Sequence, residues 1–354
     1  MIFETTTRTL VPPSPADRHA LLELPPTAEG HAEALARHRK LLECLEVAPA
    51  GAAAAAGSVR IGFWNIERGK YLEASGNLLE PLDATAWLLC ELDLGMARSD
   101  QAHTTQVLAR SLGMGYAFGV EFIELGLGDA RERAWHAGVA NQHGLHGAAI
   151  LASPALQRPA LIRLETDGKW FDGKRGERRV GGRIAVAATL AVDGVPVTLV
   201  SVHFESHGDP VQRAGQTRLL LEAIDRYAPN QPVLIGGDLN TSTLSRKWAR
   251  GSGEKPVLPA ARVLDPVPWE PLFEVAAEHG YDWQTCNTLG VPTQRTRPDG
   301  TPRPPLGRID WFLGRDLVMR DPITVPAVDT EGRALSDHEV LLVTIAPRTD
   351  GTRR

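Results

Sequence analysis

The chain has 354 residues, of which 43% are hydrophobic and 23% charged, so it can bury a large core without disulfides or structural metals. Its formal net charge of −5 provides no overall attraction to nucleic acid or to an anionic membrane. The three cysteines, Cys44, Cys90 and Cys286, are far apart, which argues against a disulfide framework or a structural zinc site. No signal peptide and no membrane-spanning run are evident, so we expect a cytoplasmic protein.

Residues 1–57 differ in composition from the rest of the chain. A proline-rich start leads into a Ser-Pro-Ala-Asp sequence that is typical of a helix N-terminus, and helices are predicted at 15–24 and 28–47. The sequence GAAAAAG at 51–57 is typical of a linker. We therefore expect a helical N-terminal appendage that packs on the main body and carries no chemistry.

Residues 58–347 are expected to form the main domain, followed by a short tail at 348–354. Helices are predicted at 77–88, 101–112 and 211–227, and a β-hairpin at 183–206 around Asp193-Gly194. Further apolar strands are predicted at 59–66, 86–93, 116–122, 148–151, 232–240, 308–314 and 340–345. Hairpins mixed with crossover helices predict an α/β or α+β fold with mixed sheets.

Polar side chains follow the apolar strands or flank them. WNIE, CELD, VHFE and GGDLN end four of the predicted strands, RIDW opens another, and SDHE precedes the last. Such residues can converge on one rim of a sheet. Carboxylate and amide oxygens suit a hard divalent cation, and histidines can act as donors to a phosphoryl group.

The order of these motifs resembles the endonuclease/exonuclease/phosphatase superfamily over residues 59–346. This resemblance implies a four-layer α/β sandwich of two packed mixed β-sheets flanked by helices. It also implies a metal-dependent hydrolase of phosphoester bonds that uses Mg²⁺ or, alternatively, Mn²⁺. The chain departs from common family patterns at Cys90 and Ala148, where glutamine and asparagine are frequent.

The resemblance assigns four residues to the metal region. Asn65 and Glu67 match the first family motif, which places an amide and an acid near the metal. Glu91 matches the acid that ligates Mg²⁺, and Asp337 matches the acid of the terminal pair near the metal. The number of metal ions, one or two, stays open.

Five further residues match catalytic positions of the family. His203 matches the histidine that contacts the scissile phosphate, and Asp238 the acid that orients or deprotonates the attacking water. Asn240 matches the amide that binds the phosphate or the nucleophile. His338 matches the histidine that touches the phosphate oxygens, and Asp310 the acid that orients it.

The sequence leaves several functions open. The substrate is a phosphoester, either nucleic acid or a small phosphorylated molecule, and no protein partner is evident. One alternative is a non-catalytic binding protein that retains the fold. Another is a zinc hydrolase that uses His136, His143 and His146 in the polar segment 124–147. Two basic runs could steer an anionic substrate: Lys174, Arg175, Arg178, Arg179 and Arg183 in the first, and Arg295, Arg297, Arg303 and Arg308 in the second.

Overall fold

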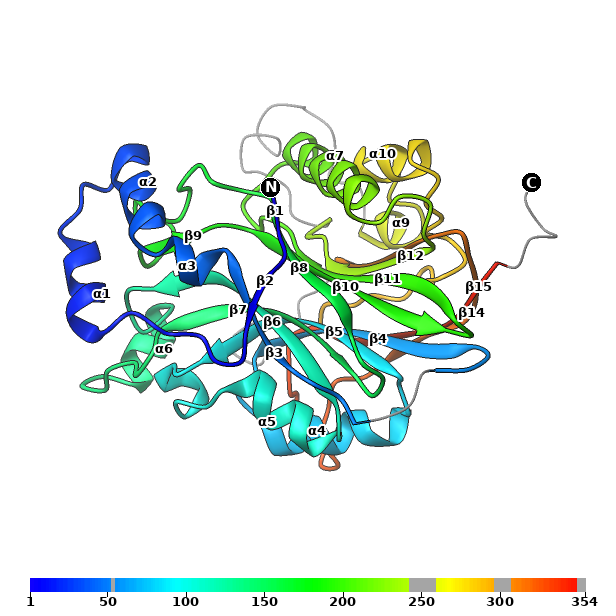
Figure 1. The fold of residues 1–354 in the computed structure, drawn as a ribbon, viewed down its shortest axis with the longest axis horizontal. Coiled ribbons are helices and arrows are strands. Elements are labelled where there is room, and N and C mark those ends of the chain that lie inside the picture. Colours follow the sequence, from blue (N-terminus) through cyan, green and yellow to red (C-terminus); the bar gives the residue numbers. More distant parts are fainter. Residues whose placement is uncertain (52–54, 242–258, 296–306, 349–354) are drawn as a thin grey trace.

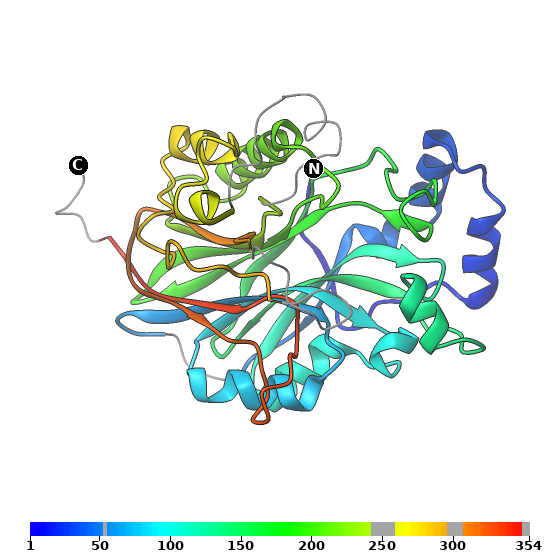
Figure 2. The same cartoon turned by 180° about the vertical axis from the view of Figure 1, so that it is seen from behind.

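A computed structural model describes residues 1–51, 55–241, 259–295 and 307–348. Its centre consists of two mixed β-sheets that pack face to face, with helices on both outer faces (Figures 1 and 2). The predicted sandwich of mixed sheets flanked by helices is confirmed. No helix in the described part of the chain is long and apolar enough to cross a bilayer.

One sheet has six strands. In spatial order they are β1 (Ile2–Phe3), β8 (Gln157–Arg163), β10 (Ile184–Val192), β11 (Val195–His203), β12 (Val233–Asp238) and β13 (Asp310–Arg315). The β10–β11 hairpin turns at Asp193 and Gly194, both of which have positive φ, as a tight two-residue turn requires. Strands β11 and β12 are parallel because helix α7 (Pro210–Tyr227) crosses between them.

The second sheet has nine strands. Their order is β14 (Leu317–Val325), β15 (Val340–Pro347), β4 (Val59–Arg68), β5 (Ala86–Leu94), β7 (Leu145–Ala152), β6 (Gly115–Glu124), β3 (Cys44–Ala48) and β2 (Thr5–Thr7), with β9 (Arg179–Gly181) paired to β6. Strands β4 and β5 are parallel and are joined through α4 (Leu72–Leu79) and the short helix η1 (Glu80–Leu82). The parallel pairs β4–β5 and β11–β12, one from each sheet, end near each other, since Asn65 of β4 donates to Asp238 of β12.

Three apolar layers hold the sheets and helices together. Side chains such as Phe63 and Val186 fill the space between the sheets. Helices α7 and α10 (Leu272–Glu278) cover the six-stranded sheet, where Ile224 packs among buried side chains. Helices α4 and α5 (Thr104–Ser111) cover the other sheet with residues such as Leu79 and Leu108. Because most strands are covered on both faces, they are apolar along nearly their whole length.

The N-terminal region contains the expected helices and also contributes strands. Helices α1 (Pro15–Leu22) and α2 (Ala28–Arg37) occur near their predicted positions, and Ser14 and Asp17 form a capping box at the start of α1. The predicted helix at 28–47 was too long. After the short helix α3 (Arg39–Leu42), residues 44–48 form β3, which pairs with β6, while β1 pairs with β8. Pairing with the open edges of both sheets outweighs the local helical pattern here.

Candidate functional site

Three predicted site residues lie opposite one another across the six-stranded sheet. His203 ends β11, Asp238 ends β12 and Asp310 opens β13, and the strand registers pair His203 with Asp238 and Asp238 with Asp310. The C-terminal ends of two parallel strands and the start of an antiparallel strand thus share one edge. This regular pairing alone brings a histidine and two carboxylates together at the rim.

The neighbouring sheet reaches the same rim through irregular strand ends. The register of β4 against β5 shifts between Asn65 and Arg68, and the register of β5 against β7 shifts between Cys90 and Leu92. Glu67, Arg68 and Glu91 have φ values of 44°, 71° and 58°. A non-glycine residue in this conformation costs about 1–3 kcal/mol, so the surrounding structure must hold it in place. Because of these bulges, the side chains at the ends of β4 and β5 do not alternate between the two faces of the sheet as they do in a regular strand.

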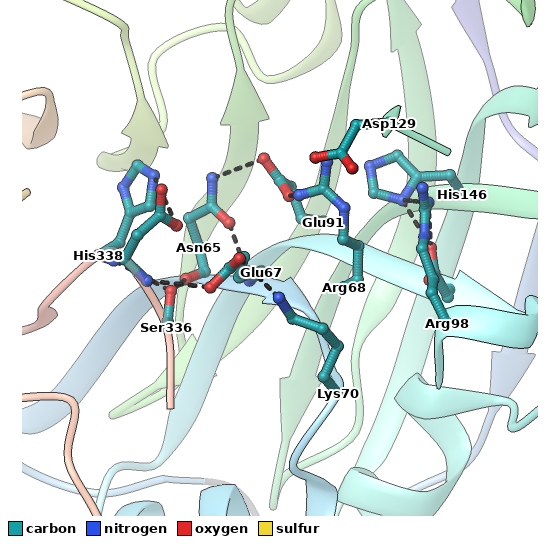
Figure 3. A network of polar contacts seen from close by, with 12 residues as sticks. Asn65, Glu67, Arg68, Lys70, Glu91, Arg98, Asp129, His146, Ser336 and His338 are labelled. Carbon is teal, nitrogen blue, oxygen red and sulfur yellow. Dashed lines mark hydrogen bonds and ion pairs between the residues drawn. The ribbon is translucent and has the colours of Figure 1, made fainter. Parts of the chain in front are cut away.

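Asn65 connects the two sheets by hydrogen bonds. Its Nδ2 donates to Glu91 Oε1 and to Asp238 Oδ2, both at 3.1 Å. Its Oδ1 accepts from the backbone N–H of Glu67 at 3.1 Å. The amide NH₂ of Asn65, rather than its oxygen, therefore faces the carboxylates (Figure 3).

His338 lies among three carboxylates. Its Nδ1 is 3.0 Å from both oxygens of Asp310, and its Nε2 is 3.8 Å from Asp238 Oδ2 and 3.7 Å from Asp337 Oδ1. Burial alone would lower the pKa of His338, but Asp310 and the other carboxylates raise it well above its usual value. The Ser336 hydroxyl accepts from the His338 backbone N–H and donates to the Asn65 carbonyl, so the loop before β15 is fixed to β4.

Asp238 is buried at the centre of the group. Its Oδ1 accepts from the backbone N–H of Asn240 at 3.0 Å, and its Oδ2 is 3.5 Å from Nε2 of His203. Burial is the main reason that the pKa of Asp238 rises to about 7; His338 opposes this rise and Asp310 adds to it. Burial, with the nearby Arg183, holds the pKa of His203 well below its usual value. The Asn240 side-chain amide donates to the carbonyl of Phe204 and joins the ends of β12 and β11.

The remaining carboxylates each have a basic neighbour. Lys70 Nζ is 2.6 Å from Glu67 Oε1, and the Asp337 backbone N–H donates to Glu67 Oε2 at 3.2 Å. Burial and the charge of Asp337 raise the pKa of Glu67. Arg68 forms an ion pair with Glu91; although burial opposes it, this pair holds the pKa of Glu91 well below its usual range.

The structure thus brings all nine predicted site residues into one connected group of contacts. The sequence interpretation missed three residues that belong to it: Arg68, Lys70 and Ser336. The available signal was adjacency, because Arg68 directly follows the WNIE motif, Lys70 comes two residues later, and Ser336 precedes the Asp337–His338 pair.

The other candidate residues have different environments. His146 is buried, and its Nδ1 lies 2.8 Å from Asp93 and 3.3 Å from Arg98. These contacts hold the ring in place, and His136 and His143 take no part in them. Asp238, Asp310 and His338 form one group of described side chains whose ligand atoms lie within 4.8 Å of one another. None of the three histidines of the segment 136–146 belongs to this group, so the alternative of a zinc hydrolase gains no support from it.

The two basic runs do not form an open anionic-ligand surface in the described residues. Arg183 is buried and pairs with Glu121 and Glu205, and Arg179, whose side chain is 13% exposed, pairs with the buried Glu124 and Glu177. Arg178 donates to backbone carbonyls of the N-terminal region. In the second run, Arg295 pairs with Glu339, Arg308 is buried, and Arg297 and Arg303 lie outside the described residues.

Comparison with known proteins gives a match to one family model and several solved structures of similar fold. The sequence model of the endonuclease/exonuclease/phosphatase family matches residues 62–338. No curated protein matches the chain. An endonuclease/exonuclease/phosphatase from Beutenbergia cavernae DSM 12333 has a TM-score of 0.56 at 18% identity, covering 82% of this chain and 72% of its own. The human Nocturnin catalytic domain with bound sulfate gives 0.52 at 17% identity, with 82% and 94% covered. A mannosyl-6-phosphatase from Bacteroides thetaiotaomicron VPI-5482 gives 0.51 at 15% identity, with 82% and 100% covered.

Proposed function

Because this chain belongs to the endonuclease/exonuclease/phosphatase family, we propose that it is a divalent-metal-dependent phosphoesterase that hydrolyses its substrate by direct attack of water. The observation that supports this most strongly is the position of Asp238. One carboxylate oxygen is fixed by the Asn240 backbone, while the other lies near Asn65, His203 and His338. A fixed carboxylate between two histidines can orient a water molecule and accept its proton beside a phosphoryl group.

The two histidines are suited to different parts of this reaction. The pKa of His338 is raised, so its ring carries a positive charge at neutral pH and can stabilise the charge that develops on the phosphoryl oxygens. Asp310 holds Nδ1 of this ring and leaves Nε2 directed toward Asp238 and Asp337. The pKa of His203 is lowered, so this ring is a neutral hydrogen-bonding group. Asp310 acts as a positioning residue because it works through His338.

The carboxylates of the second sheet fit a divalent cation. Glu67, Glu91 and Asp337 supply the oxygen ligands that Mg²⁺ and Mn²⁺ prefer. The raised pKa of Glu67, caused by burial and by Asp337, shows unfavourable crowding of negative charge that a cation would offset. When bound, such a cation would polarise a phosphoryl oxygen and stabilise the leaving oxyanion. Asn65 directs its NH₂ toward Glu91 and Asp238, so we assign it the orientation of these two carboxylates.

The group formed by Asp238, Asp310 and His338 is better suited to proton chemistry than to holding a second ion. His338 Nδ1 already lies between both oxygens of Asp310, and Asp238 Oδ2 accepts from Asn65. The raised pKa of His338 keeps a proton on Nε2, so this nitrogen has no lone pair for a metal ion, and Asp238 Oδ2 would have to give up the hydrogen bond from Asn65. We therefore assign the three residues to acid–base chemistry.

The substrate class is narrowed by charge. A net charge of −5 and the pairing of the buried arginines with acids favour a small phosphorylated molecule over a long duplex. The test is hydrolysis of bis-p-nitrophenyl phosphate, p-nitrophenyl phosphate and a plasmid, each with Mn²⁺ or with a chelator. We expect metal-dependent release of nitrophenol. Plasmid cleavage that weakens steeply with added salt would instead identify a nuclease.

The alternative function is a binding protein that has kept the fold without catalysis. It predicts no metal-dependent turnover of any of the three substrates, although Mn²⁺ could still bind. Retention of all nine residues in mutual contact favours the enzyme.

A further inference from the structure

Two basic side chains beside the proposed metal ligands suggest how this site controls its metal. Arg68 forms an ion pair with Glu91 through Nη1, and Lys70 Nζ lies 2.6 Å from Glu67 Oε1. Both follow the bulge at the end of β4, and Figure 3 shows them reaching toward these carboxylates. Two of the three carboxylates proposed to hold the cation thus already have a cationic partner.

Arg68 is held from two sides. Its Nε lies 2.9 Å from Glu132 Oε1, and Glu132 belongs to α6 (Ala130–Trp135). The Glu132 side chain is only 4% exposed, and its other oxygen accepts from the Asp129 backbone N–H at 2.7 Å. Because the guanidinium bridges two carboxylates and its own backbone has positive φ, Arg68 cannot swing into solvent without breaking both ion pairs.

The charges of this region favour a single bound ion. Glu67, Glu91, Asp337 and Glu132 together provide four negative charges, and Arg68 with Lys70 offsets two of them, while Asp310 offsets the charge of His338. One divalent cation neutralises what remains, and a second would make the region net positive at short range. A metal ion at Glu91 also has to share that carboxylate with a fixed guanidinium, which opposes its binding.

We propose that Arg68 is a positioning residue that acts as a built-in cation of the metal site, fixing Glu91 and restricting the site to one weakly held divalent ion. This inference rests on the proposed function, because it presumes that Glu91 is a metal ligand. The inference also gives a role to the ion pair of Arg68 and Glu132, which takes no part in the hydrolysis proposed above.

The test is calorimetric titration of the full chain with Mn²⁺, without substrate. We expect one Mn²⁺ per wild-type chain and at least about 10-fold tighter binding for Arg68→Met, because the variant removes a positive charge beside the ion. Arg68→Lys keeps that charge and should bind like the wild type. The matched control is Arg315→Met, since Arg315 is similarly buried and pairs with Asp225 at a distance from the site.

A second variant should change the affinity in the opposite direction. Glu132→Gln leaves Arg68 paired with Glu91 alone, so its positive charge is less neutralised and Mn²⁺ binding should weaken by roughly 5-fold. This variant also keeps the inference testable if Arg68→Met fails to fold, which a thermal unfolding curve would reveal.

Two results would overturn the inference while leaving the proposed function intact. One is two Mn²⁺ ions per wild-type chain, and the other is unchanged or weaker Mn²⁺ binding by folded Arg68→Met. If Arg68→Met does not fold, unchanged or tighter binding by Glu132→Gln would overturn it. A wild-type protein that binds no Mn²⁺ and hydrolyses nothing would instead remove the proposed function itself.

Discussion

The two sheets deliver their side chains to the site in different ways. In the six-stranded sheet, His203, Asp238 and Asp310 lie in register on three adjacent strands. In the other sheet, register shifts interrupt β4 and β5 where they approach the site, and Glu67 and Glu91 have positive φ. The regular edge carries Asp238 and Asp310, which are assigned to acid–base chemistry together with His338 from the loop before β15. The bulged edge carries Glu67 and Glu91, which are assigned to the metal.

This difference has an energetic reason. Histidine and aspartate at the ends of regular strands need only the ordinary ladder of backbone hydrogen bonds to hold their positions. Three carboxylates gathered at one place repel one another, and they need neighbouring cations, hydrogen bonds and a backbone that departs from alternation. Arg68, Lys70 and Asn65 supply those contacts. Changes at the regular edge should therefore act on turnover, and changes at the bulged edge on metal binding and stability.

The largest expected effect is at Asp238. Asp238→Asn removes the proton acceptor while keeping the size of the side chain, so kcat on bis-p-nitrophenyl phosphate with saturating Mn²⁺ should fall by about 10³-fold. Mn²⁺ affinity should change far less. Asp225→Asn, a carboxylate paired with Arg315 elsewhere, is the control. Turnover by Asp238→Asn at the wild-type rate would remove the assigned role.

Asp310→Asn should give the next largest loss. The neutral amide no longer favours the imidazolium of His338, so kcat should fall by roughly 10²-fold. The alkaline limb of the pH–rate profile should also move to lower pH, because Asp310 is the main group that raises the pKa of His338. A merely structural role would lower kcat without moving that limb, which makes the profile the deciding measurement.

A smaller effect is expected from pH in the wild type. Asp238 must be deprotonated to accept a proton, and its pKa is raised to about 7, so activity should fall as the pH drops through that value. With one titrating group, kcat/KM at pH 5.5 should be about 30-fold below its plateau. Rates measured in overlapping buffers at constant ionic strength give this curve. A flat profile between pH 5.5 and 8 would contradict the assignment.

The smallest effect concerns stability at the bulged edge. The pKa of Glu67 is raised by burial and by Asp337, so its charged form is disfavoured in the folded protein, and the neutral Glu67→Gln should have a higher free energy of unfolding at neutral pH. The same variant should bind Mn²⁺ less tightly. Chemical denaturation without metal and calorimetry with metal measure the two effects separately. A variant less stable than the wild type would show that the ion pair with Lys70 outweighs the repulsion.

The contrast between the sheets also explains what could be predicted from the sequence. The strands that deliver His203, Asp238 and Asp310 are long apolar runs ended by polar motifs, and such runs are visible without a structure. The pairing of Arg68 with both Glu91 and Glu132 was not predictable, because the bulges and the distant position of α6 create it. Which of these ion pairs form depends on which strands and helices become neighbours in the fold.

The outer strands were missed for a related reason. β1, β2 and β3 are two to five residues long; β1 and β3 pair with the open edges of β8 and β6, and β2 pairs in turn with β3. β14, which is interrupted by Arg320, Asp321 and Pro322, lacks the apolar pattern of the central strands. Similarly, the sequence offered Arg179 and Arg183 for steering an anionic substrate, but both pair with carboxylates of β6, and Arg183 also pairs with Glu205 just after β11. Contacts between segments far apart in the chain decided each of these cases.

The central claim is that the joined strand ends form a metal-dependent phosphoesterase site. The most direct measurement is hydrolysis of bis-p-nitrophenyl phosphate against Mn²⁺ concentration for the wild type, Glu91→Gln and the Asp225→Asn control. We predict saturable activation by Mn²⁺ in the wild type and control, and loss of both activation and Mn²⁺ binding in Glu91→Gln. Equal, metal-independent hydrolysis by all three proteins, or undiminished activation of Glu91→Gln, would contradict it.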